Sequence, residues 1–136
     1  SEVTGISSLT KERCISSGRD RAMRQWKIVE ESQLIFRGHT SSIDAVAMSS
    51  EEWFCGGGED GSVSLWKLQK KKPSAIRRCA HGKDANGIPR WISCVAALPY
   101  SDLIASGSCD GSVRLWKCGK DNSSIEEVRQ LPAPGF

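Results

Sequence analysis

The sequence predicts an all-β fold built from repeated units of four antiparallel strands. Three stretches of the chain are copies of one another, and they read "CISSGRDRAMRQWKI", "WFCGGGEDGSVSLWKL" and "LIASGSCDGSVRLWKC". In every copy an Asp precedes a Trp by six residues, in the pairs Asp20 and Trp26, Asp60 and Trp66, and Asp110 and Trp116. Small residues, a tight turn at the Asp and an alternating apolar segment are typical of two antiparallel strands, so each copy is predicted to be a hairpin.

The distance between the copies predicts the architecture. The three Asp residues are 40 and then 50 residues apart, which fits the period of WD40 repeats with about ten residues inserted in the last interval. The predicted fold is therefore a WD40 β-propeller, represented here by about three four-stranded blades. We expect the blades to occupy residues 1–37, 38–80 and 81–132, and residues 133–136 to begin another blade.

Each blade is expected to contain four strands in chain order. The first blade takes residues 2–8, 14–18, 22–28 and 32–36. The second takes residues 43–49, 53–57, 62–68 and 75–79. The third takes residues 92–98, 103–107, 112–117 and 125–131.

Three blades cannot close a ring, because propellers contain about four to eight blades and an open end leaves sheet faces uncovered. The chain also lacks an initiating Met and a visible secretory signal. We therefore expect it to be an excised part of a longer protein with further blades. Its 136 residues, 38% of them apolar, include no apolar run near the roughly 20 residues of a membrane span.

The repeat predicts a buried hydrogen-bond network in each blade. A His before the first strand, a Ser on the second strand, the turn Asp and the Trp lock such a blade, because the buried Trp N–H needs an acceptor. The third blade supplies His81, Ser106, Asp110 and Trp116. The second supplies His39, Asp60 and Trp66 but has Gly56 in the Ser position, so we expect its network to be incomplete. The first blade supplies Ser16, Asp20 and Trp26.

The same residues argue against an enzyme. A His and an Asp that recur once per repeat at fixed positions behave as structural residues rather than as an acid–base pair. The run Gly56 to Gly58 lies on a strand and a turn, not between a strand and a helix, so it does not predict a phosphate-binding loop. We expect these glycines to permit close strand packing near the propeller axis. The sequence predicts no catalytic residue, no cofactor and no small-molecule substrate.

The six cysteines predict neither a zinc site nor a disulfide scaffold. They never form a CxxC pair, and the chain has only two His. Cys55 and Cys94 fall at expected buried strand positions, where a free thiol acts as a small apolar side chain. This composition favours a reducing compartment.

Basic residues give the only local indication of a partner. The formal net charge is +3, and the cations cluster in two places. One cluster consists of Lys70, Lys71, Lys72, Arg77 and Arg78, and the other of Arg19, Arg21 and Arg24. Such clusters are either solvated loops or phosphate-binding surfaces.

The insert before the third blade is a second candidate surface. It reads "GKDANGIPRW" and contains Lys83, Arg90 and Trp91, a Trp outside the repeat pattern. Trp91 either contacts a partner or packs beneath its own loop.

Several stretches resemble one particular WD40 family. They include "EESQLIF" before the Gly-His pair, "KKKPSA" after the second repeat Trp, and "WISCVAAL" after the insert. Nearly the whole chain resembles the family of 55-kilodalton WD40 proteins that interact with the U3 small nucleolar RNA.

This resemblance implies properties that composition alone does not. It implies a seven-bladed propeller in a nuclear, nucleolar scaffold that binds U3 small nucleolar RNA at its box B/C region, together with box C/D particle proteins. It also implies association with the processome proteins that act on pre-ribosomal RNA to make the small ribosomal subunit. The alternative from a different class is a general WD40 platform that binds only proteins. Salt dependence separates the two, because phosphate contacts weaken steeply as salt rises.

Overall fold

The computed structural model describes residues 2–9, 12–27, 31–37, 42–50, 52–68, 70, 72–119 and 124–132. All twelve regular elements in these ranges are β-strands. Within the same ranges, no helix is long and apolar enough to cross a membrane. The prediction of an all-β chain is therefore confirmed.

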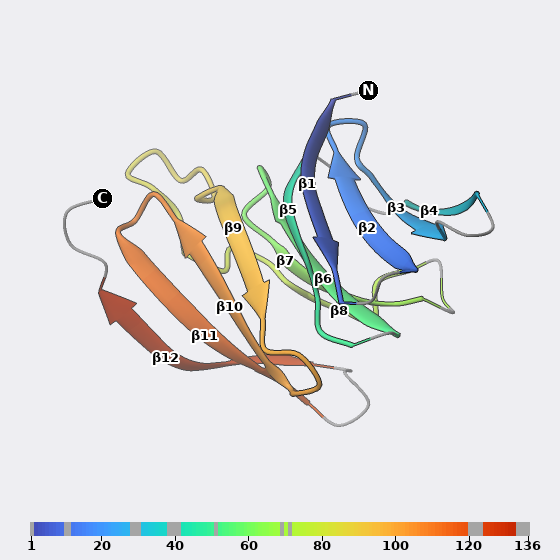
Figure 1. The fold of residues 1–136 in the computed structure, drawn as a ribbon. Coiled ribbons are helices and arrows are strands. Elements are labelled where there is room, and N and C mark those ends of the chain that lie inside the picture. Colours follow the sequence, from blue (N-terminus) through green and yellow to red (C-terminus); the bar gives the residue numbers. More distant parts are fainter. Residues whose placement is uncertain are drawn as a thin grey trace.

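The strands form three antiparallel sheets of four, each drawn from consecutive strands (Figure 1). The first sheet contains β1 (Val3–Ser8), β2 (Arg13–Gly18), β3 (Ala22–Lys27) and β4 (Ser32–Arg37). The second contains β5 (Ile43–Met48), β6 (Trp53–Gly58), β7 (Val63–Lys67) and β8 (Ala75–Arg77). The third contains β9 (Ile92–Ala97), β10 (Leu103–Ser108), β11 (Ser112–Cys118) and β12 (Ile125–Pro132).

The strand ends lie within one residue of the predicted ends, with β8 as the exception. This strand ends at Arg77, two residues before the expected end. The cause is local, because Cys79 has a φ of 48°, and a residue in the left-handed region cannot continue a strand. The expected strand of a next blade at residues 133–136 lies outside the described residues.

The three hairpins share one register. Trp26 pairs with Cys14, Trp66 with Phe54 and Trp116 with Ile104. The three Trp residues therefore occupy equivalent sheet positions, as their fixed distance from the turn Asp predicted. A slip of one residue in any hairpin would have turned its Trp to the opposite face.

The sheets stand side by side, with β1, β5 and β9 next to one another in Figure 1. The first and second sheets enclose one apolar core, in which Phe36 from β4 meets Phe54 and Trp66 from the second sheet. The ring centroid of Phe36 lies 5.1 Å from that of Phe54 and 6.1 Å from that of Trp66. Other members of this core are Ile15, Met23, Ile43, Val46 and Met48.

The second and third sheets enclose a separate core on the other face of the second sheet. Its buried members from the second sheet and the segment after it are Ala47, Cys55, Val63, Leu65 and Ala80, and those from the third sheet are Ile92, Ile104, Trp116, Cys118 and Ile125. Trp66 and Trp116 each face the sheet that precedes them. Trp26 lies in the first of the three described sheets, and 39% of it is exposed.

Two glycines of β6 permit this close approach of sheets on both sides. A Cβ at Gly56 would lie 3.1 Å from Sδ of Met23 in the first sheet. A Cβ at Gly57 would lie 2.5 Å from Cγ2 of Ile92 in the third sheet. The close packing expected for these glycines is present. Gly56 and Gly57 permit the approach of neighbouring sheets, whereas a Cβ at Gly58 would collide with the carbonyl oxygen of Ser42, next to β5 of the same sheet.

All six thiols are free. Cys55 is buried, and this burial raises its pKa to about 12. Cys94 is exposed, so the expectation that it is buried was wrong. Its side chain lies on the face of β9 that points away from the second sheet, and none of the three described sheets covers that face.

Candidate nucleic-acid interface

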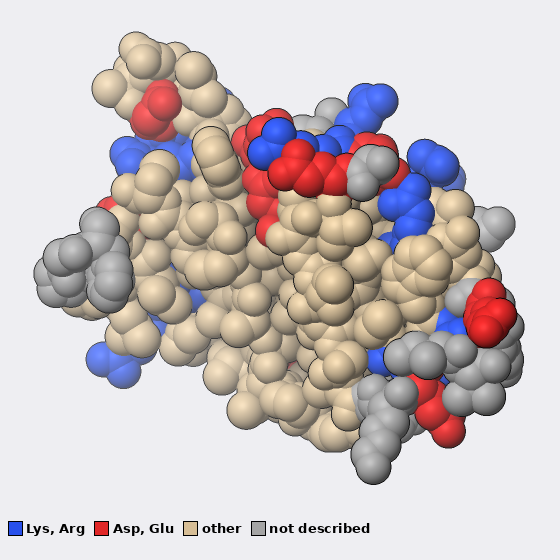
Figure 2. Space-filling view, turned by 45° about the horizontal axis from the view of Figure 1, so that its top comes forward, with Lys and Arg blue, Asp and Glu red and all other residues tan. Residues whose placement is uncertain are grey.

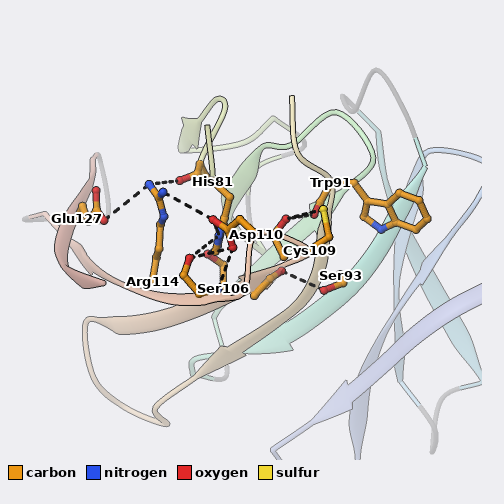
Figure 3. A network of polar contacts seen from close by, with 12 residues as sticks. His81, Trp91, Ser93, Ser106, Cys109, Asp110, Arg114 and Glu127 are labelled. Carbon is orange, nitrogen blue, oxygen red and sulfur yellow. Dashed lines mark hydrogen bonds and ion pairs between the residues drawn. The ribbon is translucent and has the colours of Figure 1, made fainter. Parts of the chain in front are cut away.

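The third sheet contains the hydrogen-bond network that the repeat predicts (Figure 3). Nδ1 of His81 lies 2.9 Å from Oδ2 of Asp110, and Nε2 of His81 lies 2.8 Å from Oγ of Ser106. The indole N–H of Trp116 donates to the same Ser106 hydroxyl at 2.8 Å. Ser106 therefore joins the segment before β9 to β11 through two side chains that are almost completely buried.

Asp110 also shapes the turn between β10 and β11. Its Oδ1 accepts hydrogen bonds from the backbone N–H of Ser112 at 3.0 Å and from the Ser112 hydroxyl at 2.9 Å. Burial acts to raise the pKa of Asp110, but the hydrogen bonds from His81 and Ser112 outweigh burial and hold the pKa below its ordinary value of 3.8. The carboxylate is thus the charged centre of the network.

Arg114 is a member of this network that the sequence analysis did not include. Its Nη1 donates to the carbonyl oxygen of Ala80 at 3.0 Å, and its Nη2 lies 3.7 Å from Oδ2 of Asp110. Its Nη1 also lies 3.8 Å from Oε1 of Glu127 on β12 (Figure 3). A signal existed in the sequence, because Arg114 follows its Asp by the same four residues that separate Arg24 from Asp20.

In the second sheet, where Gly56 replaces the expected Ser, Trp66 has a different hydrogen-bond acceptor. The indole N–H of Trp66 donates at 2.8 Å to the hydroxyl of Ser64, two residues earlier on β7. The Ser64 hydroxyl lies 3.3 Å from the carbonyl oxygen of Gly56. Trp66 therefore has an acceptor although Gly56 replaces the expected Ser, because position 64 carries a Ser where the other two repeats carry Arg. His39 lies outside the described residues.

The first sheet keeps the Ser and the Trp of the pattern. Trp26 donates to the Ser16 hydroxyl at 2.9 Å. Asp20 accepts from Nη2 of Arg24 at 2.5 Å, and this hydrogen bond is the main cause that lowers the pKa of Asp20 below 3.8. Arg24 is thus engaged inside its own blade and is not a solvated cation.

These contacts describe a structural role for the His and Asp residues. His81 is 2% exposed and is held from both ring nitrogens, so it faces the interior of the blade rather than a cleft. The described residues contain no cluster of three or more His, Cys, Asp or Glu that could hold a metal ion.

The predicted basic clusters lie at different ends of the sheets. The β2–β3 turn carries Arg19 and Arg21, at the end where the 82–91 insert also lies (Figure 1). Arg19 is exposed and its Nε lies 3.4 Å from Oε2 of Glu2, and Arg21 is exposed with a φ of 65°. In the other two turns the position of Arg21 is occupied by Gly.

The lysine run lies at the opposite end, in the connection between β7 and β8. Lys70 and Lys72 are exposed, and Lys71 lies outside the described residues. Arg77 and Arg78 lie at the far end of β8. Arg77 lies over the ring of Trp116, with Cζ 5.6 Å from the ring centroid, and both Arg77 and Arg78 are exposed. The five residues therefore do not form one patch at one end of the sheets.

The insert lies at the same end of the sheets as the β2–β3 turn (Figure 1). In Figure 2 it is largely uncharged, with one acidic side chain and basic side chains at its base. Lys83 is exposed and Arg90 is half-buried. Trp91 is 55% exposed, and in Figure 3 its indole points away from the His81 network. The interpretation that Trp91 packs beneath its own loop was wrong, because the loop folds over the neighbouring turn at Gly61 instead.

Comparisons with known proteins agree with this architecture. The profile of the WD domain, G-beta repeat, matches residues 30–67 and 78–117, together more than half of the chain. The U3 small nucleolar RNA-interacting protein 2 of Homo sapiens is 46% identical over 109 residues, which are 78% of this chain and 23% of that protein. The Ribosomal RNA-processing protein 9 of Saccharomyces cerevisiae is 30% identical over 95% of this chain and 33% of its own length.

Two solved structures have the same arrangement of strands. One is described as the structure of U3-55K, with 45% identity, and the other as the crystal structure of RRP9 WD40 repeats, with 46% identity. Each superimposes with a TM-score of 0.92 over 98% of this chain and 42% of the solved chain. The chain spans less than a third of the length of the human relative. The resemblance seen in the sequence is thus confirmed, and the chain belongs to the WD40 family of G-beta repeat proteins, where it is similar to the U3-55K proteins.

Proposed function

We propose that the protein to which this chain belongs is a scaffold subunit of the U3 small nucleolar ribonucleoprotein and acts in pre-ribosomal RNA processing. The observation that carries the proposal is the likeness to U3-55K, which extends over 98% of the chain at 45% identity. A likeness that covers all three sheets, the insert included, is more specific than the WD40 repeat pattern alone. The small ribosomal subunit is the product of this processing.

The proposal extends to partners and to location. The partners are U3 small nucleolar RNA, proteins of the box C/D particle and proteins of the processome, and the location is the nucleolus. The names of the relatives from mouse, human and yeast support an RNA particle that processes ribosomal RNA. The protein has no enzymatic activity in this role, which is consistent with the buried, fully bonded His81 and Asp110.

Exposed cations supply the phosphate contacts in this proposal. The solvent-facing candidates are Arg19, Arg21, Lys70, Lys72, Arg78 and Lys83. Arg24 is left out of this set because it bonds to Asp20. Arg77 is exposed, but it is left out because its guanidinium lies over the ring of Trp116. We expect Arg77 in particular to act on stability and not on RNA affinity.

The test uses the full-length protein and two RNAs, U3 and an unrelated box C/D small nucleolar RNA. Selective binding of U3 supports the proposal. Equal binding of both RNAs, or binding of neither, overturns it and favours a platform that contacts only proteins.

A charge-reversal variant locates the surface. Lys70→Glu combined with Lys72→Glu should weaken U3 binding and flatten the dependence of log affinity on log salt by about one unit per lost contact. The matched control is Lys117→Glu, which changes an exposed lysine near the same end but on the third sheet. Unchanged affinity and slope in the double variant would exclude the lysine run.

A further inference from the structure

The 82–91 insert has an ordered backbone. Oδ1 of Asp84 accepts hydrogen bonds from the backbone N–H of Asn86 at 2.9 Å and of Ile88 at 3.0 Å. Lys83 and Pro89 form an isolated β-bridge across the loop, and the N–H of Arg90 donates to the carbonyl oxygen of Gly82 at 3.0 Å. The insert is therefore a small closed unit rather than an open connection.

Both neighbouring blades hold the end of this unit. On the second sheet, a Cβ at Gly61 would lie 2.8 Å from the carbonyl oxygen of Arg90 and 2.8 Å from Cβ of Pro89, so the insert rests on the β6–β7 turn. On the third sheet, the hydroxyl of Ser108 donates to the carbonyl oxygen of Trp91 at 2.7 Å. The backbone of Trp91 is thus fixed immediately before β9.

The side chain of Trp91 contrasts with this fixed backbone, since it is 55% exposed and is directed away from the blade (Figure 3). Burial and hydrogen bonding account for the three repeat Trp residues, but nothing in the repeat requires Trp91. A side chain on an already fixed backbone loses less conformational entropy on binding than one on a mobile loop.

The charge around Trp91 selects the class of partner. Between residues 77 and 91 the chain has four cations, Arg77, Arg78, Lys83 and Arg90, and one acid, Asp84. The β6–β7 turn, on which the insert rests, adds one exposed acid, Glu59. The Asp84 carboxylate is occupied by two backbone N–H groups, and Arg77 covers Trp116. Arg78, Lys83 and Arg90 remain, and they complement an anionic ligand.

We propose that Trp91 is a stacking platform for an unpaired base of an RNA strand, and that Lys83 and Arg90 meet the phosphates beside that base. Single-stranded RNA combines a planar apolar group with negative charge, and base stacking on an aromatic ring needs an exposed ring face and no pocket. An apolar anchor of an acidic peptide needs a concave site. One pocket of the described residues lies at the other end of the third sheet, lined by Asp102, Lys117, Cys118, Gly119 and Glu126.

This inference rests on the proposed function, and the test separates the two. In the full-length protein, Trp91→Ala should weaken U3 RNA binding by roughly 5- to 150-fold, the range for loss of one base stack. It should leave the salt slope unchanged, because no ion is released at the ring. Trp91→Phe should retain most of the affinity. Lys83→Gln combined with Arg90→Gln should instead flatten the slope by about one to two units.

A matched control and a spectroscopic reading complete the design. Tyr100 is 70% exposed in the β9–β10 connection, at the opposite end of the sheet, and Tyr100→Ala should leave RNA binding unchanged. RNA should quench Trp fluorescence in the original protein and quench it less in Trp91→Phe.

If the original protein binds U3 RNA and Trp91→Ala binds it equally well, the stacking platform is wrong while the proposed function stands. If the original protein binds no U3 RNA, the proposed function itself fails. Loss of a protein partner in Trp91→Ala with unchanged RNA affinity would assign the ring to protein recognition and overturn the inference.

Discussion

The guanidinium of Arg77 lies over the ring of Trp116, with Cζ 5.6 Å from the ring centroid. Arg77 ends β8 of the second sheet, and Trp116 belongs to β11 of the third. The contact therefore joins two blades at a buried aromatic ring, in addition to the apolar core between them. It also gives a structural role to a cation that the sequence alone placed in a candidate RNA surface.

Arg77→Ala is expected to destabilise the protein by about 0.5 to 2 kcal/mol, the range for a cation over an aromatic ring. The free energy of unfolding from denaturant titration measures this loss. Arg78→Ala is the control, because both side chains are exposed but, of the two, only Arg77 has a ring contact in the described structure, so removal of Arg78 should change stability little. Equal effects of the two substitutions would contradict the special role of Arg77.

Ser106→Ala is expected to cost about 1 to 3 kcal/mol, because Trp116 and His81 would both lose a buried partner. Ser16→Ala removes the equivalent hydroxyl of the first blade, which among the described contacts accepts a hydrogen bond from Trp26 alone. One partner is lost there instead of two, so the loss of stability should be smaller. Thermal and denaturant unfolding of the two variants checks the order, and a larger loss for Ser16→Ala would contradict the contribution of His81.

Acid should weaken the third blade through Asp110. The pKa of Asp110 is lower in the folded chain than its ordinary value of 3.8, so the unfolded chain binds more protons between these two pKa values. The stabilisation is therefore complete above pH 3.8 and is lost as the pH falls through the folded pKa. The free energy of unfolding should be measured from about pH 2 to about pH 6. At the acidic end, the original protein should approach the stability of Asp110→Asn. A constant difference across this range would contradict the assignment.

Gly57→Ala should be more destabilising than Gly56→Ala. The added methyl at position 57 would lie 2.5 Å from Cγ2 and 3.0 Å from Cβ of the branched Ile92. The methyl at position 56 would meet only the flexible thioether of Met23 at 3.1 Å. Overpacking of this kind costs about 1 to 3 kcal/mol. Combining Gly57→Ala with Ile92→Val tests the cause, since removal of one methyl at the contact should restore part of the stability.

The thiols should differ in reactivity in the folded protein. Burial raises the pKa of Cys55 to about 12 and that of Cys118 to about 11, so neither forms the thiolate that reacts. Cys109 is exposed in the β10–β11 turn. Alkylation at neutral pH followed by mass spectrometry should label Cys109 first, and Cys55 and Cys118 only after denaturation. Early labelling of Cys55 would indicate that the two sheets around it separate in solution.

The repeated chain determined its fold and its register. The fixed distance from Asp to Trp specifies hairpin length, and the period-two alternation specifies which face each side chain takes. These are local properties, which is why the strand ends and the equivalence of Trp26, Trp66 and Trp116 were predictable. The one strand that ended early, β8, did so at a positive φ of Cys79, which no residue pattern marked.

Relations between blades were decided by the tertiary structure. The sequence showed that Gly56 lacks a hydroxyl, but only the packed sheet showed that Ser64 supplies one to Trp66. The sequence placed the Lys70 to Lys72 run and the pair Arg77 and Arg78 in one cluster because they are close along the chain. In the fold, β8 separates the described members of the two groups, which lie at opposite ends of the second sheet. The sequence could not tell whether Trp91 is covered or exposed, because coverage depends on where the insert rests. Burial, charge partners and shared surfaces arise from contacts between residues distant in sequence, and those contacts exist only once the sheets have packed together.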